Sequence, residues 1–248
     1  MVHSAVATEE PRYGLTLSLC DPATVEMAAR AGYGFVRIDW EHMMFDSGTV
    51  NHMVRIARLL GIPIHVRVSS LINVTALLDL GVDAIMVPKV SNRRVAEEAV
   101  QVVKYAQLGE RGMNSAARAL DFGKTRFADY RKQANEIVKL IVQIEDAEGL
   151  ENADEIMCLP GVDMVATGKM DISQALGVPG DTANSKVIQA EESVIRKAVH
   201  YGKMPIIKAT SQQRVKELMA MGVNWFHIGR DESLLNGAIR QLIESLKS

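Results

Sequence analysis

Apolar and polar residues follow two alternating patterns along the chain. In one pattern, apolar residues recur every three or four positions, as in 48–61 (GTVNHMVRIARLLG) and 94–106 (RVAEEAVQVVKYA). This period is typical of helices that bury one face. In the other pattern, apolar residues are nearly continuous over a length suited to a buried strand. These short apolar runs are 14–19, 34–39, 62–67, 84–89, 139–145, 163–168, 204–209 and 225–229.

Glycine separates many of the predicted helices from the strand that follows. A repeated helix–glycine–strand order is typical of βα units in a parallel sheet. Eight such units in about 250 residues predict a (β/α)8 TIM barrel. A doubly wound sheet is the alternative, but no GxGxxG follows the first strand. We expect 1–12 to be a flexible leader and 13–248 to be one barrel domain. The separating glycines are Gly32, Gly61, Gly81, Gly202 and Gly222.

Charge and composition narrow the class of partner. The formal net charge is −2 and no long basic stripe occurs, which argues against nucleic acid. No apolar run reaches the roughly 18 residues of a membrane span, and the first twelve residues do not resemble a signal peptide. Cys20 and Cys158 are isolated, so we expect buried free thiols in a reducing compartment. A cytoplasmic protein without membrane contact is the resulting expectation.

The carboxyl ends of the predicted strands carry the polar side chains, whereas the amino ends carry glycine, proline and apolar residues. In a (β/α)8 barrel the chemistry takes place at the carboxyl ends. This polarity therefore predicts the mouth of an active site. The residues at these ends are Asp39, Glu41, His42, Arg67, Lys89, Gln143, Glu145, Asp146, Lys169, Asp171, Lys208, Arg230 and Asp231.

Two of these carboxylates are candidate metal ligands. Glu145 and Asp171 end adjacent strands, with no cysteine beside them. Oxygen ligands suit a hard divalent ion such as Mg²⁺ or Mn²⁺. The alternative is that both acids form structural ion pairs with Arg67 or the lysines. Because alternate residues of a strand share a face, Gln143 would line the barrel below Glu145, as His65 would below Arg67.

The segment IDWEH at 38–42 predicts a proton-transfer group. Asp39 could orient the His42 imidazole and support its charged form. A purely structural histidine is the alternative, and His227, inside the last strand, is expected to be one. The loop at 107–125 is unusually long. Its arginines predict either a contact with an anionic ligand or a surface excursion packed on a neighbouring element.

Several motifs, taken together and in order, resemble one family. They are IDWEH (38–42), VRVS (66–69), VPKVSN (87–92), ERG (110–112), VQIED (142–146), GKMDIS (168–173) and ISQALGVPG (172–180). The chain resembles the HpcH/HpaI aldolases, which are metal-dependent pyruvate aldolases. The resemblance covers about 13–247. It implies a barrel of the phosphoenolpyruvate/pyruvate-binding type and a homo-oligomer, either a hexamer or a trimer of dimers, in which neighbours exchange the last helix.

The resemblance also implies roles for individual residues. Glu145 and Asp171 match the ligands of a divalent metal ion (Mg, Mn or Co), and Arg67 matches the arginine that contacts the substrate's 2-oxo oxygen. His42 with Asp39 matches the dyad that activates water as the base. The implied reaction is the reversible cleavage of a 4-hydroxy-2-oxo acid to pyruvate and an aldehyde, through a metal-stabilised pyruvate enolate. The residues assigned to binding the 2-oxo acid are Gln143, Gly168 and Met170.

The chain departs from the family pattern at four positions of the mouth. Trp40 replaces a glycine, and its bulk is expected to narrow the acceptor pocket. Lys89, Lys169 and Lys208 stand where the family has uncharged residues. Three added cations predict that the substrate carries an extra negative charge, and we assign all four residues to substrate binding.

Other functions fit the same residues. A biosynthetic carbon–carbon bond-forming synthase or an oxaloacetate decarboxylase could use the same fold. A Schiff-base aldolase could use one of the three lysines, since a desolvated lysine near other cations can have a lowered pKa. A protein that binds 2-oxo acids without turnover is a further alternative.

Overall fold

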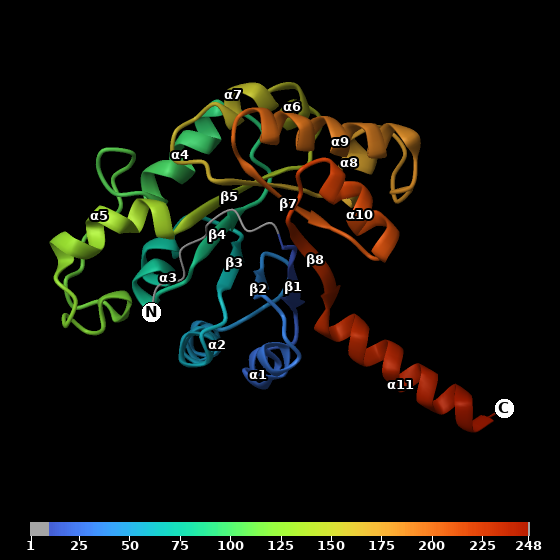
Figure 1. The fold of residues 1–248 in the computed structure, drawn as a ribbon, viewed down its shortest axis with the longest axis horizontal. Helices are drawn as coiled ribbons and strands as arrows, with labels where there is room; N and C mark the ends of the chain where they lie inside the picture. Colours follow the sequence, from blue (N-terminus) through green and yellow to red (C-terminus); the bar gives the residue numbers. More distant parts are fainter. Residues whose placement is uncertain (1–9, 248) are drawn as a thin grey trace.

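The computed structural model describes residues 10–247, and within them eight parallel strands close into a barrel in sequence order (Figure 1). Each predicted apolar run forms one strand, so the predicted (β/α)8 barrel is confirmed. The bounds shift slightly; the first strand, for example, begins two residues before the expected 14. The strands are β1 (Arg12–Leu17), β2 (Phe35–Trp40), β3 (Ile64–Val68), β4 (Ala84–Val87), β5 (Lys139–Ile144), β6 (Met164–Thr167), β7 (Met204–Lys208) and β8 (Trp225–Arg230).

Helices connect the strands, and side-chain caps fix where several of them begin. Asp46 accepts a hydrogen bond from Thr49 N at the start of the second helix, and Asn92 accepts one from Val95 N at the start of the fourth. Gly61 ends the second helix with φ +70°, a left-handed conformation that favours glycine. The helices are α1 (Ala23–Arg30), α2 (Ser47–Leu60), α3 (Val74–Leu80), α4 (Arg93–Val103), the 3₁₀ helix η1 (Arg118–Leu120), α5 (Phe127–Ile137), α6 (Ala147–Glu151), α7 (Ala153–Met157), α8 (Lys169–Ala175), α9 (Ser185–His200), α10 (Gln212–Ala220) and α11 (Asp231–Lys247).

The barrel interior changes from apolar to polar along its axis. Alternate residues of each strand point inward, and the inward residues nearer the amino ends form an apolar cluster. Towards the carboxyl ends the inward side chains are polar, and the buried ones include His65, Arg67, Gln143, Glu145 and His227. The polar site therefore has an apolar floor. The floor consists of Phe35, Ala84, Met86, Ile141, Met164, Ala166, Ile206 and Trp225.

Two histidines lie at the boundary between floor and site. His65 stacks on Phe35 with ring centroids 4.7 Å apart, and burial together with nearby Arg37 lowers its pKa to about 3. Burial likewise lowers the pKa of His227 well below its usual value. Both are therefore neutral at physiological pH. The prediction that His227 is a core histidine is confirmed.

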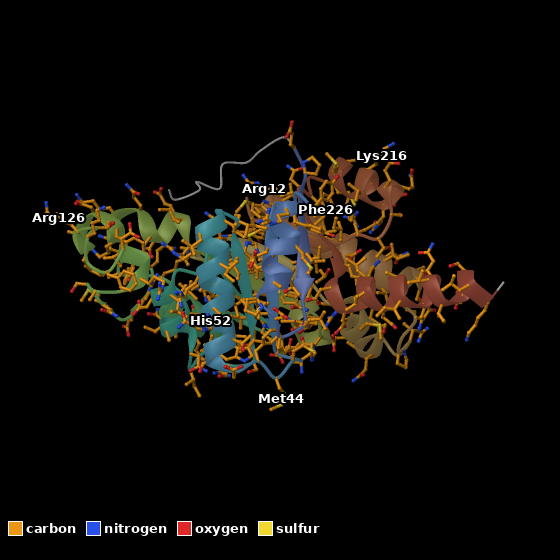
Figure 2. All side chains as sticks on the ribbon, turned by 90° about the horizontal axis from the view of Figure 1, so that it is seen from below. Arg12, Met44, His52, Arg126, Lys216 and Phe226 are labelled. Atoms are coloured by element: carbon orange, nitrogen blue, oxygen red, sulfur yellow. The ribbon has the colours of Figure 1, made fainter. Side chains whose placement is uncertain are left out.

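The two ends of the barrel are clear in Figure 2, where Arg12, at the start of β1, and Met44, in the loop after β2, lie at opposite edges. The long loop predicted at 107–125 joins α4 to α5 and contains η1. There Arg111 is buried over the Tyr105 ring, 4.5 Å from its centroid, and lies 3.6 Å from Asp79 of α3. These contacts indicate that the loop packs on neighbouring elements of the protein. They do not favour the alternative, in which its arginines contact an anionic ligand.

Three other expectations concern termini, thiols and membranes. Residues 1–9 of the expected leader lie outside the described residues, and Arg12 already belongs to β1. Cys20 and Cys158 are free, as expected, but the prediction that they are buried is wrong, because both lie in exposed connections outside the core. Among the helices of residues 10–247, none is long and apolar enough to cross a membrane.

Candidate active site

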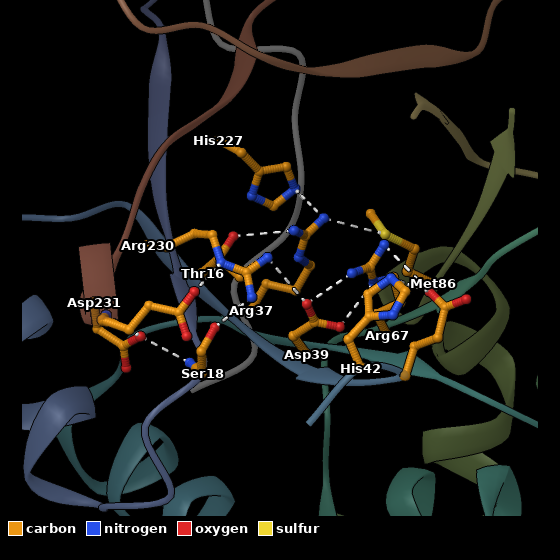
Figure 3. A network of polar contacts seen from close by, with 12 residues as sticks. Thr16, Ser18, Arg37, Asp39, His42, Arg67, Met86, His227, Arg230 and Asp231 are labelled. Carbon is orange, nitrogen blue, oxygen red and sulfur yellow. Dashed lines mark hydrogen bonds and ion pairs between the residues drawn. The ribbon is translucent and has the colours of Figure 1, made fainter. Parts of the chain in front are cut away.

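Asp39 and Arg67 form the centre of the site. They are register neighbours at the ends of β2 and β3. The Arg67 guanidinium donates two hydrogen bonds to the carboxylate, from Nε to Oδ1 at 2.9 Å and from a terminal nitrogen to Oδ2 at 2.7 Å (Figure 3). Asp39 is fully buried and Arg67 is 7% exposed. This paired fork holds the guanidinium in a fixed orientation, with little freedom to turn.

Two further arginines surround the same carboxylate. Arg230, at the end of β8, lies 3.3 Å from Asp39 Oδ2, and Arg37 lies below it on the inward face of β2. Burial alone would raise the pKa of Asp39, but the hydrogen bonds and charge of Arg67, with the charges of Arg37 and Arg230, outweigh burial and lower that pKa. Asp39 is therefore an anion that anchors cations, not a group that exchanges protons near neutral pH.

Arg37 sits in an unusual place for an arginine. Its terminal nitrogens lie 3.2 Å from His227 Nε2, 3.3 Å from Met86 Sδ and 3.0 Å from Thr16 Oγ1 (Figure 3). Burial, followed by repulsion from Arg67, lowers its pKa to about 9, so it remains charged at neutral pH. The positive charge beneath Asp39 favours anions in the mouth above it.

His42 lies beside Glu41 in this structure. His42 Nε2 is 3.5 Å from Glu41 Oε2, and the same oxygen is 3.2 Å from a terminal nitrogen of Arg67. Within residues 10–247, the expected contact between Asp39 and His42 is not formed, because Arg67 occupies both oxygens of Asp39. The His42 side chain is 57% exposed, so it faces the open mouth, where a substrate would enter.

Glu145 is a buried carboxylate at the end of β5, only 3% exposed. The backbone N–H of Lys89 donates to its Oε1 at 3.0 Å, and the Gln143 amide donates to Oε2. Burial, and then repulsion from Asp171, raises its pKa to about 7. As the sequence predicted, Gln143 lies on the same inward face of β5.

Gly168 brings the β6–α8 corner against this carboxylate. A Cβ at Gly168 would lie 2.2 Å from Glu145 Oε2 and 2.9 Å from Gln143 Nε2, so only glycine allows this approach. Asp171 follows in the first turn of α8 and is exposed to the mouth, as is Met170. The corner therefore places Asp171 near enough to Glu145 for the two charges to repel each other.

The donor set fits a hard divalent ion. Glu145 and Asp171 offer carboxylate oxygens whose mutual repulsion a cation would relieve, and Gln143 Oε1 is buried without a hydrogen-bond partner. No group of three or more histidine, cysteine or acidic residues that could hold a metal exists within the described part of the chain. Two oxygen ligands leave coordination positions for water and substrate, as Mg²⁺ sites commonly do.

The residues that depart from the family pattern occupy different environments. Trp40 donates its indole N–H to Phe45 O at 2.8 Å, and this hydrogen bond fixes the orientation of the ring. Lys169 Nζ lies 3.1 Å from Glu191 of α9. Lys208 is exposed on the inward face of β7, and no partner of its side chain occurs among residues 10–247. Lys89, at φ +52°, contributes its backbone N–H to Glu145, while its side chain is exposed.

Sequence reasoning did not assign roles to several residues that the structure brings into the site. Arg37 precedes Asp39 by two positions, so strand alternation could have placed both on one face. Glu41 and Arg230 stood at strand ends but received no role. Nothing in the local sequence singled out Glu191, because its partners lie on other elements.

The closed parallel barrel, with buried acids and arginines at the carboxyl ends of its strands, defines a (β/α)8-barrel enzyme whose site suits anionic substrates. Residues 12–237 match the model of the HpcH/HpaI aldolase/citrate lyase family. The chain belongs to this family.

Its relatives are named for aldol chemistry. The chain is 36% identical, over 98% of its length and 88% of the other protein, to a hydroxypyruvate/pyruvate aldolase of Deinococcus radiodurans. It is 34% identical, over 93% of its length and 88% of the relative, to a 4-hydroxy-2-oxo-heptane-1,7-dioate aldolase of Klebsiella pneumoniae. Among solved structures, the citrate synthase SbnG matches with a TM-score of 0.89 and 29% identity, covering 96% of this chain and 94% of the other. The chain is thus an aldolase-type lyase.

Proposed function

We propose that this enzyme is a divalent-metal-dependent aldolase that reversibly cleaves a 4-hydroxy-2-oxo acid to pyruvate and an aldehyde. The observation that carries the proposal is the fixed Arg67 guanidinium close to the repelling Glu145–Asp171 pair. These groups suit a 2-oxo acid, which presents two oxygens to a cation and develops negative charge on one of them.

Each residue has a role that follows from its position. Glu145 and Asp171 would hold the ion, which would act as the electron sink for the carbonyl group. Arg67 stabilises the developing oxyanion, and Asp39 keeps its guanidinium oriented. His42, exposed in the mouth, takes the 4-hydroxyl proton, and Glu41 rather than Asp39 supports the resulting charge. Gln143, Gly168 and Met170 border the place of the 2-oxo acid.

The direct test is an assay of a panel of 2-oxo acids with and without aldehydes. Metal-stripped enzyme should be inactive, and added Mg²⁺, Mn²⁺ or Co²⁺ should restore turnover with pyruvate as the product or donor. Full activity after exhaustive chelation would contradict the metal-dependent reaction. A covalent pyruvyl-lysine trapped by borohydride would instead establish the Schiff-base alternative.

A synthase is the second candidate, because the chain matches a structure named as a citrate synthase at 29% identity. Such an enzyme would join an enolate to a 2-oxo acid acceptor. The same panel distinguishes the two: a synthase would form a carbon–carbon bond with a carboxylated acceptor and leave 4-hydroxy-2-oxo acids uncleaved. An oxaloacetate decarboxylase would release carbon dioxide without an acceptor.

We also propose a homo-oligomer in the cytoplasm. Helix α11 extends away from the barrel (Figure 1), and its large apolar side chains are about half exposed or more. Their spacing places them on one face, which a second copy would cover. These apolar side chains are Leu234, Leu235, Ile239, Leu242, Ile243 and Leu246.

The proposed cytoplasmic location rests on the cysteines, because free, exposed cysteines suit a reducing compartment.

Lys208 is expected to recognise a negative charge on the acceptor. Lys208→Met should raise KM about fivefold for an aldehyde that carries a carboxylate or phosphate, since one exposed charge contact contributes roughly 1 kcal/mol. A neutral aldehyde of similar size should be almost unaffected, and the difference should shrink as salt rises. Steady-state kinetics at low and high ionic strength measure both effects.

Lys216→Met is the matched control, because Lys216 lies on α10 near the edge of the molecule that carries Arg12, away from the mouth (Figure 2). It removes the same charge and should leave both KM values unchanged. Equal losses for charged and neutral aldehydes in Lys208→Met would exclude charge recognition by this lysine.

A further inference from the structure

Glu191, on α9, is a buried carboxylate that joins three other elements. Its side chain is 1% exposed. Thr167 Oγ1 donates to Oε1 at 3.2 Å, whereas Lys169 Nζ at 3.1 Å and an Arg214 terminal nitrogen at 2.9 Å both contact Oε2. These donors belong to β6, α8 and α10. One carboxylate therefore ties the end of β6 and the start of α8 to the outer helices.

The segment that Glu191 holds, where β6 ends and α8 begins, also carries Asp171. Thr167 is the last residue of β6, Lys169 is the first of α8, and Asp171 lies in the first turn of that helix. Gly168, between the two tethered residues, packs against Glu145 on the inner side. No side chain caps α8 at Gly168. The position of its first turn is therefore set by packing on the inside and by Glu191 on the outside.

At the β6–α8 corner, the buried Glu191 carboxylate lies between the cations Lys169 and Arg214. A buried carboxylate is costly unless it is paired, and Glu191 has two cations as partners. The same ion pair compensates the positive charge of Lys169. It also holds the Lys169 ammonium against α9, so that the ammonium does not point into the mouth. Without Glu191, the Lys169 ammonium would lose its carboxylate partner and would repel a divalent cation bound beside Asp171, whereas Arg214 would keep its contacts with Glu217 and Glu192.

We propose that Glu191 is a positioning residue for the metal-dependent reaction. Through Thr167 and Lys169 it holds the β6–α8 corner so that Asp171 faces Glu145, and it neutralises Lys169 so that the corner accepts a divalent cation. Lys169 is accordingly part of this support and not the residue that binds the acceptor. The inference rests on the proposed metal dependence.

The test is Glu191→Gln, which keeps the shape and removes the charge. We expect the dissociation constant of Mn²⁺, measured by calorimetry on the purified full-length enzyme, to rise tenfold or more, since loss of a group that orients a metal ligand typically costs 10- to 100-fold. At saturating Mn²⁺, kcat should largely return. Glu192→Gln, one residue along α9, weakens only contacts with Arg196 at 3.5 Å and Arg214 at 3.8 Å and touches neither Thr167 nor Lys169, so this variant should bind Mn²⁺ as the unaltered enzyme does.

A second variant separates charge from general stability. Adding Lys169→Met to Glu191→Gln removes one uncompensated cation and should recover part of the Mn²⁺ affinity, although it restores no native contact. If affinity falls with no recovery, in step with a lower melting temperature, Glu191 has only a structural role and the inference is overturned. If Glu191→Gln does not fold, Thr167→Val, which breaks one tether and changes no charge, should raise the dissociation constant several-fold.

The outcomes also separate this inference from the proposed function. Unaltered enzyme that binds no divalent ion refutes the metal-dependent reaction, and this inference with it. Unaltered enzyme that binds Mn²⁺ while Glu191→Gln binds it equally well overturns only the positioning role.

Discussion

Glu145→Gln is expected to abolish both metal binding and turnover. The substitution keeps the side-chain volume but removes one of two carboxylates that would hold the ion. Lewis-acid stabilisation contributes several kcal/mol, and each 1.4 kcal/mol is tenfold in rate, so kcat should fall by about 10³-fold or more. Calorimetry with Mn²⁺ and single-turnover assays with a 4-hydroxy-2-oxo acid measure the two losses separately.

The control for this variant is Glu148→Gln, an exposed acid three residues further along the chain, where α6 begins. It should retain metal affinity and rate. Glu145→Gln should also fold at least as well as the unaltered enzyme near neutral pH without metal, because burial and Asp171 disfavour the charged Glu145. Unchanged Mn²⁺ affinity in Glu145→Gln would remove Glu145 from the ligand set.

Arg67→Ala is expected to lower kcat by about 10²- to 10³-fold, since loss of one oxyanion donor typically costs that much. Arg67→Lys should recover little of this rate, because a flexible ammonium cannot reproduce the fork that Arg67 forms with Asp39. Steady-state kinetics on a 4-hydroxy-2-oxo acid separate kcat from KM. A change confined to KM would place Arg67 in substrate binding alone.

Arg67→Ala also leaves Asp39 buried without its main partner. Removing one member of a buried ion pair typically costs about 3–5 kcal/mol of stability. Arg67→Met combined with Asp39→Asn removes both charges and should restore much of the melting temperature while leaving kcat low. If kcat recovers together with stability, the Arg67 effect is structural and not catalytic.

The barrel itself was predictable from the sequence because its determinants are local. A buried strand in a parallel sheet is a short apolar run, and a helix that packs on it shows one apolar face, so each of the eight units can be recognised alone. The boundaries moved by a residue or two where hydrogen bonding with a neighbouring strand, as between β1 and β8, set the ends. The exposure of Cys20 and Cys158 was not predictable, because residue type does not report whether a connection is covered.

The set of residues at the mouth was also largely determined by the sequence, since every parallel strand ends at the same face of the barrel. Which of these charged side chains form ion pairs with one another was decided only by the tertiary structure. Asp39 lies close to His42 in the sequence, yet the register of β2 with β3 gives Asp39 to Arg67 and leaves His42 beside Glu41. The three mouth lysines look alike in the sequence, but Glu191, twenty-two residues beyond Lys169, compensates that lysine and leaves Lys208 in the open mouth. A charge acts through space on whichever group lies nearest, and only the closed barrel with its outer helices fixes which group that is.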